Sequence, residues 1–380
     1  MSAKGGAGIV FRAPIYGASG YADECLGVLL ALAEAGLEVQ TIPIGHQEED
    51  IQQLLPADSR ATLARMKHNR LDLRRSIFCQ DGPASIFDIQ MRGRLQVGRT
   101  MLETNSLADG WVDILDPMDE VWVPSNYLVD VFTRAGVPKK KLRVVSRGVD
   151  TNAYRPGAAP MKIPGARGFN FLSVFDWSYR KGPDILLRAY LSEFQAGEDV
   201  ALVLKTYQFN NSGEEPEASI TDFIEREMGL TLENTPPIIL LNGFLPNADM
   251  PGLYAASNAF VLPTRGEGWG QPFMEALACQ CPVIATRWSG QLDFLDDENS
   301  YLIDIEGLAP APADIDPEIY SGHCWAAPSV DHLRQLMRHV FRHPEETAGR
   351  AKRGHQQVVE RWSWPICGRR WAAEFQRLLG

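Results

Sequence analysis

Long apolar runs are absent from this sequence of 380 residues. No stretch reaches the roughly 20 consecutive apolar residues that a helix needs to span a bilayer. The first residues also lack the pattern of a secretory signal peptide. From these two absences we expect a cytoplasmic protein without membrane-spanning helices.

Cysteine is scarce and metal-binding patterns are missing. The six cysteines are scattered and form no C-x-x-C pair, so we expect reduced thiols and no disulfide framework. No cluster of histidine, cysteine or carboxylate residues has the spacing of metal ligands, and no Asp-x-Asp motif follows a predicted strand. The sequence therefore predicts no bound metal and no cofactor.

Positive charge is also in short supply. Lysine and arginine number 37 against 48 aspartates and glutamates, which gives a formal net charge of −11 at pH 7. This balance weighs against a general nucleic-acid binder. The stretch Arg60–Arg75 is locally basic. It forms either a solvated helix face or a weak contact with an anionic acceptor or a membrane surface.

The composition that remains is that of an ordinary globular protein, with 45% hydrophobic and 22% charged residues. A chain of this length is expected to form two domains of about 150–200 residues each. In the first half, short apolar runs alternate with helical patterns such as Tyr21–Ala35, which predicts a doubly wound parallel sheet. The strands predicted in this half are Gly8–Pro14, Val39–Ile44, Ser85–Ile89, Glu120–Pro124 and Leu142–Val145.

A linker is predicted over Thr151–Gly168, which is rich in proline, glycine and alanine and has no periodicity. The strand–helix alternation then restarts, so a second sheet of the same kind is expected. Ligands of such sheets bind at the carboxyl ends of the strands. The strands predicted in this half are Phe169–Phe175, Val200–Thr206, Ile238–Asn242, Ala259–Pro263 and Pro282–Thr286.

The most informative segment is Arg265–Ala276, which reads Arg-Gly-Glu-Gly-Trp-Gly-Gln-Pro-Phe-Met-Glu-Ala. Its glycines let backbone amides approach a ligand, and Pro272 suits the first turn of a helix. Free amides at the helix start, together with the helix dipole, favour an anion such as a diphosphate. Glu275 would repel a phosphate, so we expect it to accept hydrogen bonds from neutral hydroxyls such as a ribose diol. Glu267 stands where a sugar can be held.

This segment resembles the E-x7-E signature of the retaining glycosyltransferases called family 4 or group 1. The resemblance implies the GT-B fold, an α/β architecture of two Rossmann-like, doubly wound parallel-sheet domains that face each other across a cleft. It also implies that Glu267 is catalytic and faces the donor sugar, and that Glu275 holds the nucleotide ribose. The residues of this turn that are expected to bind the donor are Gly268, Trp269, Gly270, Gln271 and Phe273.

A second segment, Phe175–Pro183, is similar to the family's G-R-x-x-x-x-K-G turn, whose arginine and lysine grip the donor diphosphate. Lys181 matches the lysine and is expected to be catalytic. Asp176, however, stands where the family has its arginine. We expect Arg180, or backbone amides, to replace that arginine.

Other segments extend the resemblance to the nucleobase and to the first domain. Gly243, Phe244 and Leu245 match the strand end that contacts the base through backbone groups. Ser289 is either a helix N-cap or a ligand of the donor sugar. The loop that carries Gly17 and Gly20 lacks the G-x-G-x-x-G fingerprint of dinucleotide binding. In the family, the matching loop meets the donor phosphate.

Glu103 is a candidate for a sugar or acceptor contact, although ordinary polarity at a strand end explains it equally well. At the C-terminus, Ser363 can cap a helix that presents an apolar stripe. In proteins of GT-B architecture the final helix packs back on the first domain. The expected domains are therefore residues 1–155 together with 365–380, and residues 156–364.

The resemblance implies a metal-independent, retaining hexosyltransferase. The donor is a nucleoside diphosphate sugar, such as a UDP- or GDP-sugar. The acceptor hydroxyl belongs to a glycan, a lipid, a protein or a small molecule, among which the sequence does not decide. Two alternatives remain: a non-catalytic relative that binds a sugar nucleotide or acts as a scaffold, and a nicotinamide-dependent oxidoreductase, which the missing fingerprint disfavours.

Overall fold

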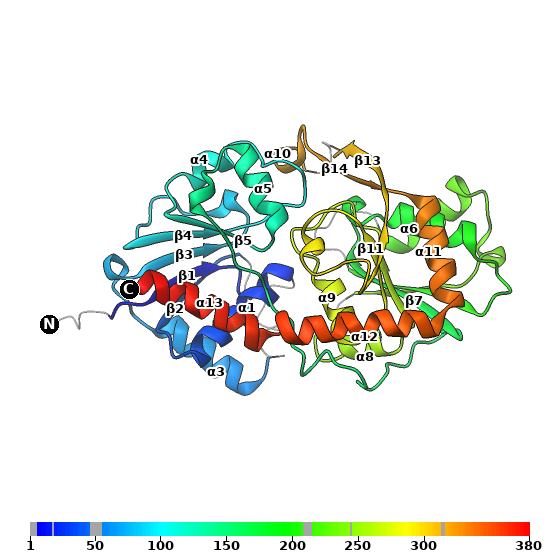
Figure 1. The fold of residues 1–380 in the computed structure, drawn as a ribbon, viewed down its shortest axis with the longest axis horizontal. Helices are drawn as coiled ribbons and strands as arrows, with labels where there is room; N and C mark the ends of the chain where they lie inside the picture. The colour runs from blue at the N-terminus through cyan, green and yellow to red at the C-terminus, as the bar shows by residue number, and fades with distance from the viewer. Residues whose placement is uncertain (1–5, 17–18, 46–54, 208–214, 244, 313–315) are drawn as a thin grey trace. The chain divides into compact units, whose positions relative to one another are not determined.

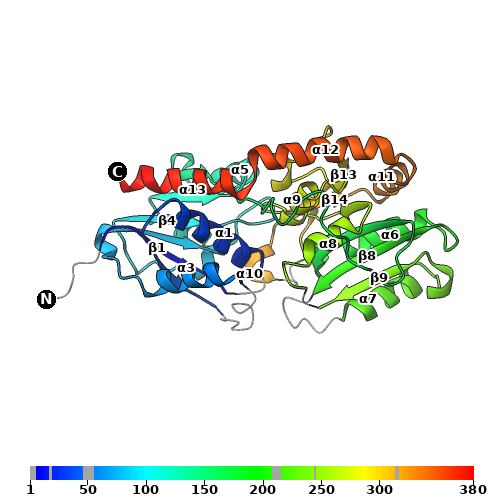
Figure 2. The same cartoon turned by 90° about the horizontal axis from the view of Figure 1, so that it is seen from below.

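The computed structural model describes residues 6–16, 19–45, 55–207, 215–243, 245–312 and 316–380 (Figures 1 and 2). The chain divides into two compact units, each formed by segments that are distant in sequence. Unit 1 comprises Met1–Gly148, Ala311–Cys324 and Arg361–Gly380, and unit 2 comprises Val149–Pro310 and Trp325–Glu360.

Unit 1 is built on a parallel sheet of six strands in the order β2-β1-β3-β4-β5-β6. The chain adds β2 on one side of β1 and β3 on the other, so a topological switch point lies between β1 and β3. The strands are β1 (Ile9–Ala13), β2 (Val39–Pro43), β3 (Ile77–Asp81), β4 (Leu95–Arg99), β5 (Glu120–Val123) and β6 (Leu142–Val144). The helices are α1 (Gly20–Glu34), α3 (Ala57–His68), α4 (Trp111–Leu115), α5 (Asn126–Ala135), α10 (Pro317–Tyr320) and α13 (Trp364–Leu379).

Helices α1 and α13 cover one part of this sheet and lie along each other in both views (Figures 1 and 2). Ser19 starts α1 by accepting a hydrogen bond from the amide of Ala22, 3.2 Å away. On α13 the apolar stripe turns inward. Trp371 and Phe375 pack on Trp122 of β5, with ring centroids 5.5 and 4.8 Å from it. The last helix therefore belongs to the core of unit 1.

Unit 2 contains a second parallel sheet of six strands, in the order β12-β11-β10-β7-β8-β9. Its strands are β7 (Phe169–Asp176), β8 (Val200–Tyr207), β9 (Ile238–Asn242), β10 (Ala259–Leu262), β11 (Val283–Thr286) and β12 (Tyr301–Ile303). The α-helices of this unit are α6 (Pro183–Glu193), α7 (Pro216–Asp222), α8 (Met250–Ala255), α9 (Gln271–Ala278), α11 (Val330–Arg342) and α12 (Pro344–Arg361).

A further strand pair, β13 (Ile305–Pro310) and β14 (Cys324–Pro328), brackets the segment Ala311–Cys324, which belongs to unit 1. His323 anchors this segment. Its Nε2 lies 2.9 Å from the carbonyl of Leu107 and its Nδ1 lies 2.9 Å from the hydroxyl of Thr104. Burial lowers the pKa of His323, which favours the neutral imidazole with its proton on Nε2. No pattern in the sequence predicted that this segment belongs to unit 1 while the chain on either side of it belongs to unit 2.

One predicted strand is wrong. Ser85–Ile89 contains no strand, and Ala84–Ile86 is a 3₁₀ helix that follows Pro83. The two strands of that region, β3 and β4, lie on either side of it. Both end in buried polar residues, Asp81 and Arg99, which break the apolar runs by which strands were recognised. The other predicted strands agree with the observed ones to within one residue at either end.

The six cysteines, all in described parts of the chain, are free thiols, as predicted. Within those same parts, no helix combines the length and the apolar character needed to cross a bilayer.

Candidate functional site

The glycine-rich turn Gly266–Gly270 connects the region after β10 to helix α9 at the carboxyl end of the unit 2 sheet. Gly270 has a φ of +96°, and a Cβ there would lie 2.8 Å from the ring of Phe273. A Cβ on Gly290 would lie only 2.1 Å from the carbonyl oxygen of Gly268. Because both positions exclude larger residues, the turn keeps one backbone shape against the segment that follows β11.

Lys181 and Glu267 form the central ion pair of this region. Lys181 Nζ donates to Glu267 Oε1 at 2.6 Å, and the two side chains are 9% and 8% exposed. Arg180 Nη1 lies 3.4 Å from the other carboxylate oxygen of Glu267 and donates to the carbonyl of Gly266 at 2.8 Å. The structure thus brings together Arg180, Lys181 and Glu267, all of which the sequence analysis selected, although Lys181 and Glu267 are 86 positions apart in the chain.

Asp176 completes a group of four, which we call the unit 2 charge cluster: Asp176, Arg180, Lys181 and Glu267. Burial raises the pKa of Asp176, but Lys181 and Arg180 lower it by more, so its pKa lies below the usual value. The same opposing causes leave the pKa of Glu267 below its usual value. Both carboxylates are therefore ionised at neutral pH, and they balance the two cations.

Backbone geometry explains why these residues meet. Asp176 ends β7, and Lys181 closes the 3₁₀ helix Tyr179–Lys181 that follows it. Gly182 has a φ of +72°, and a Cβ there would lie 2.3 Å from the carbonyl oxygen of Pro263 at the end of β10. The Lys-Gly turn is therefore pressed against the strand that leads to Glu267.

Ser289 has a φ of +74°, an uncommon conformation for a residue with a side chain. Ser289 stands at the N-cap position of the 3₁₀ helix Gly290–Asp293, as one of the two predicted alternatives had it, but its hydroxyl makes no capping hydrogen bond. Instead it accepts from the amide of Glu267 at 3.0 Å and lies 3.0 Å from Gln291 Oε1, to which it donates. Ser289 therefore holds the backbone of Glu267 in place.

Glu275 lies on α9, and protein groups contact both of its carboxylate oxygens. The hydroxyl of Tyr254 donates to Oε2 at 2.9 Å, and Gln271 Nε2 donates to Oε1 at 3.2 Å. Two neighbours in the same motif point elsewhere. The side chain of Phe273 is fully buried against Phe260, and that of Trp269 packs on Phe294. These two positions can offer a ligand only backbone groups.

The strand end expected at the nucleobase is described in part. Phe244 lies outside the described residues, Leu245 is half-buried, and Gly243 is exposed with a φ of +100°. Sequence reasoning missed Lys205 of β8, a buried lysine whose Nζ donates to the carbonyl of Gly243 at 2.5 Å. Burial lowers the pKa of Lys205. A lysine within the apolar strand Val200–Tyr207 was the signal available in the sequence.

Arg265 was also missed as an organising residue. Its guanidinium makes a bidentate pair with Asp184 at 2.7 and 2.9 Å and lies 3.6 Å from the centroid of the Tyr179 ring. These contacts tie the start of the glycine-rich turn to the Lys-Gly turn and to α6. By contacting both Asp184 and Tyr179, Arg265 holds the two turns of the site in place.

The predicted residues of the first half lie in unit 1. Gly17 is outside the described residues. Gly20 begins α1, and its carbonyl accepts from Arg147 Nη1 at 3.0 Å. Glu103 is half-buried in a bend four residues after β4, next to Thr104, which bonds His323.

Sequence reasoning missed a buried group in unit 1 that we call the unit 1 charge cluster: Glu24, Asp81 and Arg99. Arg99 makes an ion pair with Glu24 and lies 3.6 Å from Asp81. All three are 0 to 1% exposed. Burial and, more weakly, Glu24 raise the pKa of Asp81, while Arg99 lowers it, with the result that it reaches about 7. No local motif marks these residues, because they lie on α1, β3 and β4.

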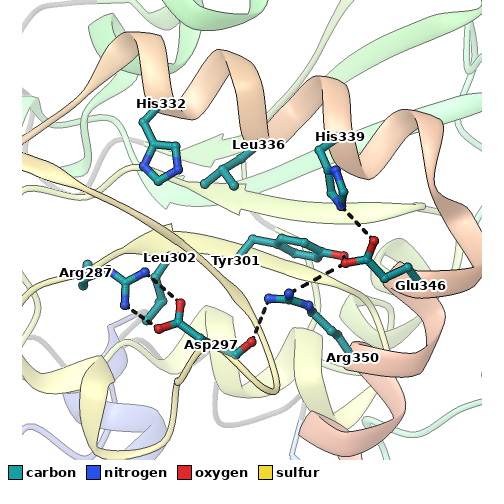
Figure 3. Close-up of a pocket in the computed structure, with 9 residues that line it drawn as sticks. All are labelled: Arg287, Asp297, Tyr301, Leu302, His332, Leu336, His339, Glu346 and Arg350. Carbon is teal, nitrogen blue, oxygen red and sulfur yellow. Dashed lines mark hydrogen bonds and ion pairs between the residues drawn. The ribbon is translucent and has the colours of Figure 1, made fainter.

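A pocket of about 310 Å³ lies elsewhere in unit 2, beside β12, α11 and α12 (Figure 3). Figure 3 shows its charged side chains turned toward one another. Arg287 pairs with Asp297 through two contacts of 2.7 Å, and His339 lies 3.0 Å from Glu346. Since these charges are matched inside the protein, the pocket offers no evident selectivity for an ion. It is lined by Arg287, Asp297, Tyr301, Leu302, His332, Leu336, His339, Glu346 and Arg350.

Comparison with known proteins agrees with this geometry. A family model described as glycosyl transferases group 1 matches residues 167–314. This region of the chain, which lies almost entirely in unit 2, is therefore similar to the group 1 glycosyltransferases. The matched region includes the whole unit 2 charge cluster and Glu275, whereas Gly20 and Glu103 lie outside it.

Curated relatives share limited stretches. The chain is 35% identical over 94 residues to O-antigen chain mannosyltransferase B of Escherichia coli, which covers 25% of this chain and 22% of that protein. It is 30% identical over 172 residues to D-inositol 3-phosphate glycosyltransferase of Saccharomonospora viridis, covering 43% of this chain and 38% of that protein. The matches thus span less than half of the length of these two relatives.

Among solved structures, Anabaena Alr3699/HepE in complex with UDP and glucose superposes with a TM-score of 0.70. The sequences are 15% identical, and the match covers 97% of this chain and 99% of that one. At this identity the likeness establishes the fold. Together with the two six-stranded parallel sheets, it confirms the predicted α/β fold class of GT-B type.

Proposed function

We propose that this protein is a retaining glycosyltransferase of group 1 that moves a sugar from a nucleoside diphosphate sugar to an acceptor hydroxyl. One observation carries the proposal: the pair Lys181–Glu267 is buried at the carboxyl end of the unit 2 sheet, beside the start of α9. A donor of this kind has a diphosphate, which needs cations and helix amides, and a sugar, which needs hydrogen-bond acceptors. The carboxyl end of this sheet provides two cations, two carboxylates and the first amides of a helix.

Each group has a distinct task in this proposal. The diphosphate takes up hydrogen bonds from Lys181, Arg180 and the first amides of α9. Glu267, released from part of its pairing with these cations, then accepts from hydroxyls of the donor sugar and stabilises positive charge at the anomeric carbon. Glu275 accepts from the ribose hydroxyls. Gly243 and Leu245 meet the base through backbone groups.

The reaction is a displacement on one face of the sugar. The bond between the anomeric carbon and the diphosphate oxygen breaks, and a bond to the acceptor oxygen forms on the same face. The proton of the acceptor hydroxyl passes to the departing diphosphate. Catalysis then rests on positioning and on stabilising the charge of the leaving group, which is the task of Lys181 and Arg180. A metal ion is not needed for that task.

Gly17, Gly20 and Glu103 of unit 1 stay predictions for contacts with the donor phosphate and with the sugar or acceptor. The donor base, UDP or GDP, and the acceptor are to be identified by experiment, and the cytoplasmic location also stays a prediction. Incubating the protein with UDP- and GDP-sugars and measuring free nucleotide tests the activity. Thermal shifts with UDP, GDP and ADP identify the base, because a bound ligand stabilises by mass action.

Calorimetry with the preferred nucleoside diphosphate tests the site itself. Glu275→Ala is expected to weaken binding by about 1.5–3 kcal/mol, the range for hydrogen bonds to a charged group. An unchanged dissociation constant would remove Glu275 from the site.

Asp176 favours one second candidate, a non-catalytic relative that binds a sugar nucleotide. It neutralises a cation that the diphosphate needs, and this lowers the capacity of the cluster to stabilise a leaving group. The two candidates differ in one result: only the enzyme releases nucleotide from its donor.

A further inference from the structure

Tyr254 contacts Glu275 directly, although the chain separates them by 21 positions. Its hydroxyl donates to Oε2 at 2.9 Å, while Gln271 Nε2 donates to Oε1 at 3.2 Å. Each oxygen of the carboxylate is therefore oriented by a different protein donor. Since a carboxylate oxygen has about two lone-pair sites, one that accepts from the protein can also accept from a ligand hydroxyl.

Tyr254 is held rigidly. It lies on α8 with 1% of its surface exposed, and its ring packs edge-on against Tyr154 and at an angle against Phe260, with centroids 5.9 and 5.8 Å away. Burial, and then the neighbouring Glu275, raise the pKa of its phenol well above the ordinary value. The hydroxyl thus keeps its proton at any physiological pH and can only donate toward Glu275.

A carboxylate on a helix surface ordinarily samples several rotamers, and fixing it on binding costs free energy. In this chain the buried phenol has already selected one rotamer. The hydroxyls of a ligand then bind to carboxylate oxygens of Glu275 that are already oriented before the ligand arrives. A pair of neighbouring hydroxyls, such as the 2′ and 3′ hydroxyls of a ribose, gains more from such an arrangement than a single hydroxyl does.

We propose that Tyr254 is a positioning residue that orients Glu275, assisted by Gln271, and thereby sets a preference for ribonucleotides over dideoxynucleotides. The inference rests on the proposed role of Glu275 and adds to it the group that gives this carboxylate its direction. The competing explanation is that the Tyr254 hydroxyl only stabilises the packing of α8 on α9.

The test is calorimetry with UDP and 2′,3′-dideoxy-UDP, or the corresponding GDP pair if guanine is the preferred base. Tyr254→Phe keeps the ring and removes only the hydroxyl. We expect the ribonucleotide to bind roughly three- to tenfold more weakly to this variant, the value of one hydrogen bond, with the dideoxynucleotide unchanged. A merely structural role would weaken both ligands by the same factor.

Tyr190 offers a matched control in the same unit. It is also fully buried, and its hydroxyl donates to the carbonyl of Pro237 at 3.0 Å. Tyr190→Phe is expected to lower the melting temperature while leaving the ratio of the two affinities at the wild-type value.

The outcomes separate the two ideas. If wild type binds both nucleotides equally, the proposed role of Glu275 fails. If wild type prefers the ribonucleotide and Tyr254→Phe keeps that preference, the role of Tyr254 is overturned and that of Glu275 stands. Should circular dichroism show that Tyr254→Phe is unfolded, Gln271→Met carries the same test at Oε1. A selective loss of ribonucleotide binding supports orientation of Glu275, and an unchanged ratio overturns it.

Discussion

Each unit buries a group of charged side chains at the carboxyl end of its sheet, and the two groups differ in balance. In unit 2, two carboxylates face two cations, and the pKa values of Asp176 and Glu267 fall below their usual range. In unit 1, Glu24 and Asp81 share Arg99, and the pKa of Asp81 rises to about 7. Burial raises the pKa at both places. In unit 2 Lys181 and Arg180 outweigh it, whereas in unit 1 Arg99 and, more weakly, Arg147 do not, because Glu24 adds to the effect of burial.

The difference has a functional meaning. A carboxylate that stays charged when buried can exchange a cation for a ligand hydroxyl, and its partners can turn to a diphosphate. A carboxylate that takes up a proton near neutral pH lowers the charge of its surroundings instead. We therefore interpret the unit 2 cluster as the part that meets a charged ligand and the unit 1 cluster as part of the internal structure of its unit.

The largest effect is expected from Glu267→Gln, which removes the charge that we propose to face the donor sugar. Turnover should fall by about a hundredfold or more, the cost of losing one electrostatic contact to a transition state, while nucleoside diphosphate affinity changes by only a few fold. Steady-state kinetics and calorimetry check both. Glu346→Gln, which removes another cation-paired carboxylate of unit 2, is the control. Normal turnover in Glu267→Gln would sink the assignment.

The variant Asp81→Asn tests whether Asp81 of unit 1 takes up a proton near neutral pH. The folded pKa of Asp81 is raised above the ordinary value of about 3.9, so its contribution to stability is fully present below that value and is lost as pH rises through about 7. The slope is at most about 1.4 kcal/mol per pH unit. Hydrogen exchange of β3 and β4 peptides between pH 5 and 8 should show this loss in wild type and a flatter profile in the variant.

Unit 2 provides the internal reference for that experiment. The pKa values of Asp176 and Glu267 are lowered, so their contribution is present above the ordinary carboxyl range and is lost only as pH falls below it. Peptides of β7 should therefore keep constant intrinsic-rate-corrected protection between pH 5 and 8. A parallel change in both units would contradict the comparison.

A smaller effect is expected from Asp176→Asn. If Lys181 and Arg180 bind the diphosphate as proposed, this change removes a carboxylate that competes for them, so nucleoside diphosphate binding should tighten by roughly three- to tenfold, about 1 kcal/mol. Affinity for the unphosphorylated nucleoside should not change. Weaker binding of the diphosphate would show that Asp176 instead orients Lys181 productively.

The smallest effect is expected from removal of metal ions. If Lys181, Arg180 and the amides of α9 carry the charge of the leaving group, EDTA should leave turnover within experimental error. Complete loss that Mg²⁺ or Mn²⁺ restores would mean that the cluster is insufficient alone.

Much of the fold could be predicted because its signals are local. The strand, turn and helix around Gly270 follow one another along the chain, as do β7, the Lys-Gly turn and α6. Where a strand carried buried polar residues, as in β3 with Asp81 and β4 with Arg99, apolar periodicity failed and Ser85–Ile89 was chosen wrongly. The segment Ala311–Cys324 shows the same limit, since no local pattern indicates to which unit a segment will pack.

By itself, the sequence determined the two α/β halves and the residue types of the unit 2 site, because both depend on spacing over a few turns of chain. Only the tertiary structure decided how these residues are charged and oriented. The partners of Glu267 and Arg99 lie 86 and 75 positions away, and one of the two donors to Glu275, Tyr254, comes from a different helix. Burial and pairing over such distances exist only once the chain has folded, and they set the pKa values and fix the rotamers.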